Sequence, residues 1–245
     1  MRYGYRRQVV LQIGLSVMSL AGAVIAQEKS AAPGEVAPAK TATERFDLEV
    51  REDIFAGFEG DEDALKRGEE KCEQALKDNP KNSEAKVWLG AVRVFKAGQL
   101  FQQNKPLEAM PLWNKGQKDM DDAVAMDPDN VGVRIPRASV LLPSARNTPA
   151  MVREPILKKV REDFEYIYNK QAKHLDELGE HSRGELRMGL ADTYRLLGQL
   201  DKSNEQLEAV AKELPDTEYA SVAKKWLAAE PKTKLAHNCL GCHSK

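Results

Sequence analysis

Apolar residues recur three and four positions apart from about residue 44 to residue 231, which is the spacing of helices with one buried face. This part of the chain has no run in which apolar and polar residues alternate strictly, as they do along a half-buried strand. Few turn dipeptides interrupt it. The hydrophobic pattern therefore predicts one all-α domain over 44–231.

A repeat is visible within this domain when its prolines are aligned. The clearest copy covers 184–217, and its large, small and aromatic positions fall at Leu190, Ala191, Tyr194, Gly198, Ser203, Leu207 and Pro215. Two antiparallel helices cross closely only where small side chains face each other, so we expect Ala191 and Ser203 to meet at such a crossing. Pro215 is expected to end the second helix.

These positions resemble the tetratricopeptide repeat (TPR), a helix pair of about 34 residues that stacks on its neighbours. Arg187 stands where this family usually has Trp, so the match is incomplete. The resemblance implies an all-α, TPR-like helical solenoid of degenerate helix pairs, whose concave groove binds a segment of a protein partner. Two weaker copies share the second-helix spacing, at Gly68, Cys72, Ala75 and Pro80 and at Gly116, Met120, Ala123 and Pro128.

The interval between these weaker copies is longer than one repeat. Leu89 and Gly90 mark a first helix inside it, so either the helices are extended or a loop around 103–106 is inserted. Cys72 falls at a small position of a helix and is predicted to be a buried, inert thiol. The three tryptophans follow helical spacing and are predicted to lie in the core: Trp88, Trp113 and Trp226.

Three further helices are predicted outside the repeat copies. One covers Val131–Leu142, is interrupted near Pro136 and is closed at Pro143. Another runs over about 154–178 with apolar residues along one face. The last helix follows Pro215 and is expected to cap the solenoid with apolar groups on one side, at Tyr219, Val222, Trp226 and Leu227.

The chemistry of the chain is concentrated near its end. Cys239, Cys242 and His243 form the pattern C-x-x-C-H, which is typical of covalent c-type haem attachment. Two thiols three positions apart lie on one side of a helical turn, where they can add to the two vinyl groups of a porphyrin. His243 follows directly and can ligate the iron as its proximal ligand. The tail, 232–245, therefore resembles the haem site of c-type cytochromes and predicts one covalent haem c.

The same tail allows other outcomes. The thiols can form a disulfide or remain an unligated pair, and His237, Cys239, Cys242 and His243 can supply four ligands to zinc. With haem bound, the sixth iron ligand divides an electron carrier from a haem enzyme with an open, peroxidase-like position. The candidate distal ligands are His237, His174, His181 and Met188. Surface exposure is expected of His174 and His181, and core packing of Met188.

The beginning of the chain has the features of an export signal. Arg2, Arg6 and Arg7 precede an uncharged stretch that closes with small residues at Ala26, so 1–26 is predicted to be a cleaved signal peptide. Retention as a membrane anchor over Val9–Ile25 is the alternative, and only then is membrane association expected. Residues 27–43 are rich in Ala, Pro, Lys and Glu and are predicted to be a flexible linker.

Export supports the haem prediction, because c-type haem is attached outside the cytoplasmic membrane in bacteria. Removal of the three signal arginines leaves 34 basic against 38 acidic residues, a net charge near -4, which excludes nucleic acid as a partner. The acidic runs Glu59–Asp63 and Asp119–Asp122 lack the spacing of a calcium loop and are expected to be solvated helix surface.

The sequence thus predicts a periplasmic or otherwise exported TPR scaffold that carries one haem and docks to a redox protein or an envelope assembly. Its function would be electron transfer or redox-partner adaptation. The alternatives are a pure protein-interaction scaffold with a zinc or disulfide tail, and a haem enzyme. No P-loop, dinucleotide glycine pattern or H-E-x-x-H helix occurs in the chain, so nothing in the body predicts catalysis without the haem.

Overall fold

The computed structural model describes residues 45–146, 148–230 and 233, and every regular element in these ranges is helical. In chain order the elements are α2 (Asp47–Glu59), α3 (Glu62–Asp78), α4 (Ser83–Gln102), α5 (Pro106–Met126), α6 (Val131–Arg146), α7 (Ala150–Gln171), the 3-10 turn η2 (Leu175–Glu177), α8 (Glu180–Leu196), α9 (Leu200–Glu213) and α10 (Glu218–Leu227). The all-α prediction is confirmed. Within these ranges the helices are too short or too polar to cross a membrane.

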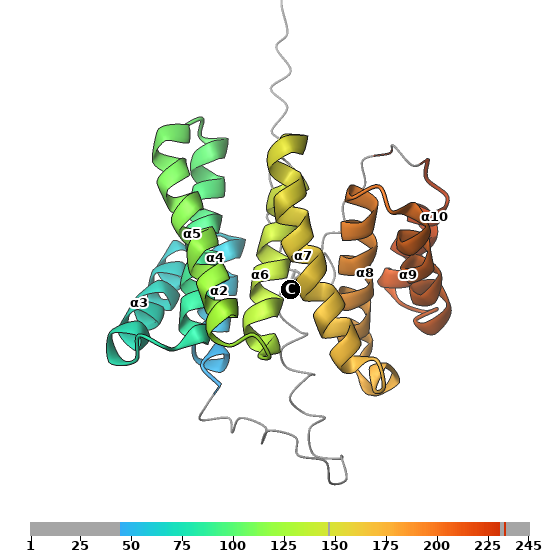
Figure 1. Cartoon of the computed structure of the whole chain (residues 1–245), viewed down its shortest axis with the longest axis horizontal. Helices are drawn as coiled ribbons and strands as arrows, with labels where there is room; N and C mark the ends of the chain where they lie inside the picture. The colour runs from blue at the N-terminus through green and yellow to red at the C-terminus, as the bar shows by residue number, and fades with distance from the viewer. Residues whose placement is uncertain (1–44, 147, 231–232, 234–245) are drawn as a thin grey trace, which may run out of the picture.

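Neighbouring helices pair along the chain. Helix α2 packs on α3, α4 on α5, α6 on α7 and α8 on α9, and α10 packs on α9 after the last pair. The pairs stand side by side in Figure 1, and the first helices α4, α6 and α8 also contact one another in succession. This stacking of helix pairs is the predicted TPR-like solenoid.

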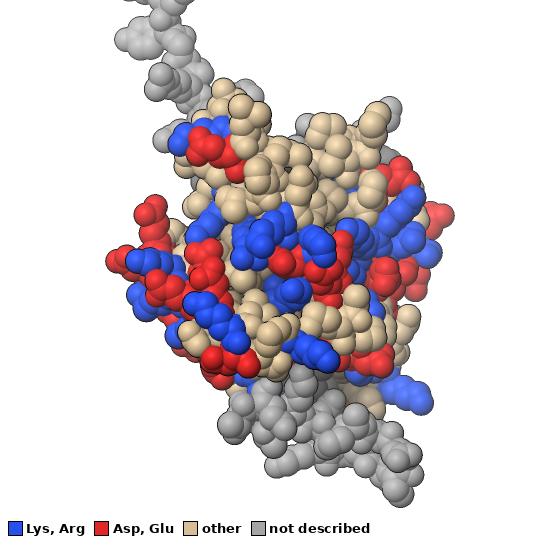
Figure 2. All heavy atoms as spheres, turned by 60° about the vertical axis from the view of Figure 1, so that its left-hand side comes forward, with Lys and Arg blue, Asp and Glu red and all other residues tan. Residues whose placement is uncertain are grey.

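The turns within three of the helix pairs gather at one edge of the molecule. The upper edge in Figure 1 holds the ends of α4, α6 and α8 and the starts of α5, α7 and α9, and the end of α10 lies beside them. We call this the turn edge. Figure 2 shows a belt of charged side chains across the middle of one face, whereas uncharged side chains predominate toward the turn edge.

The clearest predicted repeat corresponds to α8 and α9. The Ser203 hydroxyl donates a 2.8 Å hydrogen bond to the carbonyl oxygen of Ala191, and both residues are fully buried. Gly198, between the helices, has φ 74°, a left-handed conformation that glycine adopts without strain. Helix α9 ends at Glu213, just before Pro215. The predicted crossing and the predicted end of the second helix are confirmed.

Helices α4 and α5 explain the long interval between the weaker repeat copies. They contain 20 and 21 residues, and only residues 103–105 separate them, so the helices are extended and no loop is inserted. Gly90 and Gly116 face each other at their crossing. A Cβ built on either glycine would lie 2.8 Å from the carbonyl oxygen of the other, so the two backbones are almost in contact.

Helix α6 differs from its prediction because proline does not interrupt it. The helix runs from Val131 through Pro136 and Pro143 to Arg146. A proline removes one helical hydrogen bond and disfavours a helix interior. Twelve of the sixteen residues of α6 are buried, however, and the helix packs against both α4 and α7. Tertiary packing therefore outweighs the local cost of the two prolines.

The helix predicted over about 154–178 is displaced toward the N-terminus. Helix α7 begins at Ala150 and ends at Gln171. The predicted C-terminal boundary was wrong because Leu175 and Leu178 are apolar at helical spacing. They pack onto the body from the separate turn η2 and the residue after it, and Leu178 is buried there.

Two clusters of buried apolar side chains form the core. The larger cluster extends from α2 to α8, and the smaller one joins α8, α9 and α10 around Leu207 and Trp226. The predicted core positions of the three tryptophans are confirmed, since Trp88, Trp113 and Trp226 are all buried. Cys72 is fully buried as predicted, and burial raises the pKa of its thiol, which keeps the sulfur protonated and unreactive.

A chain ended at Glu230 is expected to keep its helical content and its cooperative melting, because both apolar clusters precede this residue. The expected loss is at most about 1 kcal/mol, measured by thermal and urea unfolding followed by circular dichroism. A control chain ended at Asp216 also lacks α10 and the buried Trp226, and should lose about 3–5 kcal/mol. Equal destabilisation of both chains would instead make the tail part of the core.

Candidate binding groove along helix α7

The residues predicted to attach haem lie outside the described residues. This applies to Cys239, Cys242 and His243 and also to His237. The predicted signal peptide over 1–26 and the linker over 27–43 lie outside them as well. These assignments therefore remain predictions.

The candidate distal ligands on the body occupy three different environments. His174 is exposed, and its Nδ1 atom lies 2.9 Å from a carboxylate oxygen of Glu177. His181 was expected at the surface but is half-buried, with its Nδ1 atom 2.6 Å from the Tyr219 hydroxyl. Met188 is fully buried in the smaller apolar cluster, which confirms its predicted packing role. The structure does not bring the three side chains together into one site.

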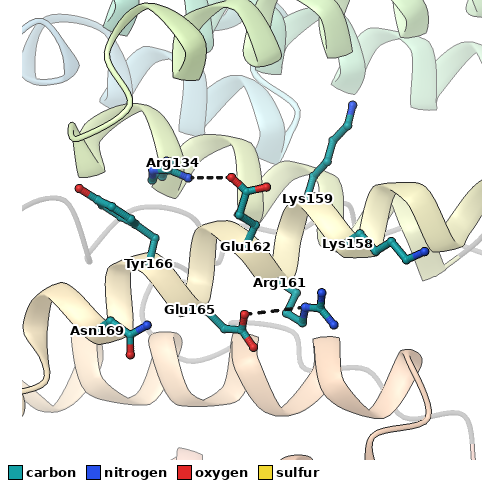
Figure 3. A pocket seen from close by; sticks show the side chains of 8 residues that line it. All are labelled: Arg134, Lys158, Lys159, Arg161, Glu162, Glu165, Tyr166 and Asn169. Carbon is teal, nitrogen blue, oxygen red and sulfur yellow. Dashed lines mark ion pairs between the residues drawn. The ribbon is translucent and has the colours of Figure 1, made fainter.

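A hollow lies along the outer face of α7. Its volume is about 460 Å³, and seven of its eight lining residues belong to α7, as Figure 3 shows: Arg134 from α6 with Lys158, Lys159, Arg161, Glu162, Glu165, Tyr166 and Asn169. A second hollow of about 230 Å³ shares Glu165 and Asn169 with it and continues toward α8 and α9. We call the two together the α7 groove.

Charge and aromatic groups dominate the α7 groove. The first hollow has four cationic side chains and two carboxylates, and the second adds Tyr168, Tyr194 and Lys202 to its lining. None of the lining residues is a Ser, Cys or His. The paired charges and tyrosine rings of the groove are groups of the kind that contact a bound polypeptide.

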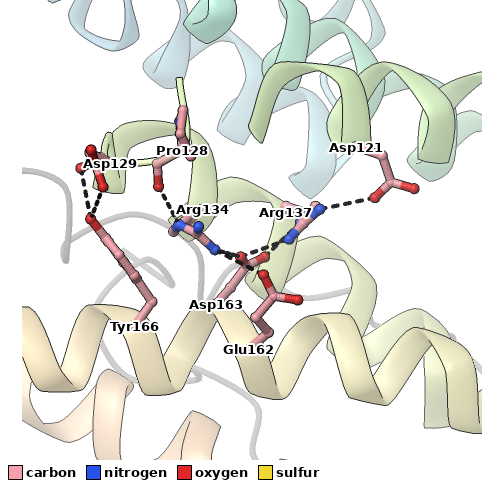
Figure 4. A network of polar contacts seen from close by, with 8 residues as sticks. All are labelled: Asp121, Pro128, Asp129, Arg134, Arg137, Glu162, Asp163 and Tyr166. Carbon is pink, nitrogen blue, oxygen red and sulfur yellow. Dashed lines mark hydrogen bonds and ion pairs between the residues drawn. The ribbon is translucent and has the colours of Figure 1, made fainter. Parts of the chain in front are cut away.

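A buried ion network lies beneath the α7 groove and joins three helices. Asp163 of α7 is fully buried and accepts hydrogen bonds from two arginines of α6, as Figure 4 shows. Arg134 donates at 2.8 Å, and Arg137 donates at 2.7 and 2.8 Å. Arg137 also donates at 3.0 Å to Asp121 of α5, which in turn accepts from Lys159. The network fixes α5, α6 and α7 relative to one another.

Arg134 links this network to the wall of the groove. Its Nε atom donates to the carbonyl oxygen of Pro128 at 2.8 Å, and its guanidinium lies 4.1 Å from the centre of the Tyr166 ring. The Tyr166 hydroxyl donates to Asp129 at 3.0 Å. A guanidinium over an aromatic face is an attractive contact, so the tyrosine is held in place on the groove wall.

The electrostatics of the network follow from burial and pairing. Burial alone would lower the pKa of the Arg137 guanidinium, but the hydrogen bonds and charge of Asp163 outweigh burial and raise that pKa. Burial raises the pKa of Asp163, and the hydrogen bonds from Arg137 and Arg134 oppose this shift. Burial and the hydrogen bond to Asp129 raise the pKa of Tyr166, so its hydroxyl stays protonated at neutral pH.

Sequence reasoning missed this network. The run Asp119–Asp122 was predicted to be solvated surface, but Asp119 pairs with Arg93 of α4, and Asp121 pairs with Arg137 and Lys159. A signal was present in the sequence. Asp163 stands directly before the core residue Phe164 on the apolar face of its helix, where an acid needs a buried partner.

Comparisons with known proteins add little to this description. No family model matches the chain, and no curated protein matches it either. A structural comparison finds a thermophilic TPR protein from Thermus thermophilus at 18% identity, with a TM-score of 0.36. The match covers 73% of this chain and 98% of that protein.

Proposed function

We propose that the protein is an exported helical-repeat scaffold that carries one covalently attached haem c on its C-terminal tail and acts in electron transfer or as a redox-partner adaptor. The observation that carries the proposal is the C-x-x-C-H pattern of Cys239, Cys242 and His243. Among chains of this composition, about one in a thousand is expected to contain such a pattern by chance.

The donor set fits a c-type haem. Cys239 and Cys242 would hold the porphyrin through thioether bonds, and His243 would ligate the iron. Bound haem supplies one-electron redox chemistry, and the residues of the chain would hold the porphyrin and ligate the iron. Cys72, the third cysteine, takes no part because its side chain is fully buried and its thiol pKa is raised. Just two reactive thiols remain for the two vinyl groups.

The body supports a role in protein binding. Stacked helix pairs present long surfaces that suit polypeptide segments, and the α7 groove offers paired charges beside tyrosines on one such surface. A redox protein or an envelope assembly is the partner that a haem-bearing scaffold would need. The three arginines that precede the uncharged stretch near the start of the chain support export to the periplasm. The net negative charge of the remaining residues argues against nucleic acid as a partner.

Expression together with a cytochrome c maturation system is expected to give a red protein whose mass includes one haem and whose haem stain survives a denaturing gel. The variant Cys239→Ala/Cys242→Ala should be colourless, because no thiol remains to form a thioether bond. His243→Ala should keep covalent haem and change its absorption spectrum, since only the iron ligand is lost. Cys72→Ala is the control and should load haem normally.

A colourless wild-type protein would contradict the haem proposal. Stoichiometric zinc in that protein, or a tail disulfide found by mass spectrometry, would support the interaction scaffold instead. If haem is present, the spin state of the iron separates the two remaining functions. A six-coordinate low-spin iron supports electron transfer, whereas a high-spin iron that binds added ligands supports a haem enzyme.

A further inference from the structure

Exposed apolar side chains gather at the turn edge. In the described part of the chain, seven large apolar residues are exposed, and five of them lie at the end of α4 or the starts of α5 and α7: Phe101, Leu107, Met110, Met151 and Val152. Met151 and Leu107 are almost fully exposed, at 89% and 90%. They form two groups along this edge, one at the turn between α4 and α5 and one at the start of α7, and an exposed apolar group on an otherwise charged surface marks a place where another group binds.

The C-terminal tail leaves the body at the same edge. Helix α10 ends there at Leu227, beside the end of α8 (Figure 1). The Arg195 guanidinium, near the end of α8, donates a 2.6 Å hydrogen bond to the carbonyl oxygen of Glu230. This contact fixes where the remaining fifteen residues begin, and the haem-binding pattern lies within them.

The length of the tail decides which apolar residues the haem can reach. Nine residue steps from Glu230 to Cys239 span at most about 30 Å. Helix α10 contacts α8, and α8 contacts α7, so two steps of about 8–10 Å each bring the tail to α7. Helix α5 is one step farther, because α8 also contacts α6 and α6 contacts α5, which puts Leu107 at about 24–30 Å, close to the full extended length of these nine residue steps. Met151 and Val152 are therefore within easy reach of the tail, whereas Leu107 would require a fully extended tail.

Charge also favours the start of α7. Haem combines an apolar ring with two carboxylates, and carboxylates are stabilised near the first turn of a helix. The first turn of α7 has no acidic residue, and Arg153 follows Val152 there. The first turn of α5 contains Glu108, which would repel a carboxylate.

We infer that the haem-bearing tail folds back along the turn edge and packs its porphyrin against Met151 and Val152 at the start of α7. This inference rests on the proposed haem attachment. The occupant is a segment of this chain, because that segment starts at this edge, has the length to reach α7 and carries an apolar group that its own few residues cannot cover. Docking places the haem beside the α7 groove, where a bound partner would meet it.

Methionine methyl NMR on the full-length haem protein tests the inference. With ¹³C-methyl methionine, the ferric iron should shift and broaden the Met151 signal relative to the haem-free Cys239→Ala/Cys242→Ala protein. The signals of Met110 and Met126, two exposed methionines on α5, should not change. The variant Met151→Leu assigns the resonance.

Matched variants then test the contact itself. Val152→Glu should return the Met151 signal to its haem-free position, because a carboxylate beside the ring opposes docking. Leu107→Glu places the same charge at the second residue of α5 and should leave the Met151 signal shifted. Both positions are exposed, and circular dichroism verifies that both variants are folded. A haem-loaded protein with an unshifted Met151 signal would overturn the docking alone, whereas a protein without covalent haem would overturn the proposed function and the docking together.

Discussion

Asp163→Ala is expected to lower the free energy of unfolding by about 3–5 kcal/mol, because it leaves two arginines buried without their shared carboxylate. Asp163 is fully buried, and the side chains of Arg134 and Arg137 are 8% and 7% exposed. Water therefore cannot replace the lost hydrogen bonds. Urea unfolding at neutral pH, followed by circular dichroism, measures the change.

Two controls show whether burial causes this loss. Asp122→Ala removes an exposed partner of Lys118 on the same surface and is expected to cause no measurable change. The triple variant Arg134→Met/Arg137→Met/Asp163→Leu replaces the charges by apolar groups and should recover most of the stability. If Asp163→Ala cost less than about 1 kcal/mol, the network would not hold α6 and α7 together.

The part of the fold that the sequence predicted depends on contacts between residues close in the chain. The Ala191–Ser203 crossing joins two helices separated by only a short turn, so one window of sequence contains both partners. The Asp163 network joins positions 26 and 29 residues apart. No local pattern pairs such positions, and the acidic run in α5 was therefore predicted to be surface.

The helix boundaries that were predicted wrongly also depend on contacts between residues that are distant in the chain. Pro136 and Pro143 carry a local preference against helix, and the sequence alone gives no measure of how firmly α4 and α7 enclose α6. Leu175 matched the helical period of α7, although it packs from a separate turn. In both places tertiary packing overrides a local rule.

The candidate functional sites also differ in whether the sequence alone predicts them. The proposed haem-attachment pattern could be found in the sequence because the chemistry of haem attachment needs residues at fixed short spacing. The α7 groove and the exposed position of Met151 and Val152 depend on how helices stack, so no pattern in the sequence marked either of them. The sequence singled out Met188 as a distal candidate, whereas the structure encloses Met188 and exposes Met151.

Gly116→Val is expected to lower the free energy of unfolding by about 2–3 kcal/mol, because it forces apart the close crossing of α4 and α5. A Cβ at this position would lie 2.8 Å from the carbonyl oxygen of Gly90 and 2.9 Å from a methyl group of Val94. The carbonyl belongs to the backbone of α4, so relief requires movement of a whole helix. Thermal melting of the variant beside wild type measures the effect.

Asn114→Val on the exposed side of α5 is the matched control for Gly116→Val. It introduces the same β-branched side chain into the same helix, so it reproduces the propensity cost of valine without the steric clash. Because glycine is a poorer helix former than asparagine, the difference between the two variants gives a lower limit for the cost of the clash at the crossing. Equal melting temperatures for Gly116→Val and Asn114→Val would mean that α4 and α5 separate at little cost, and that the near contact of their backbones does not contribute to stability.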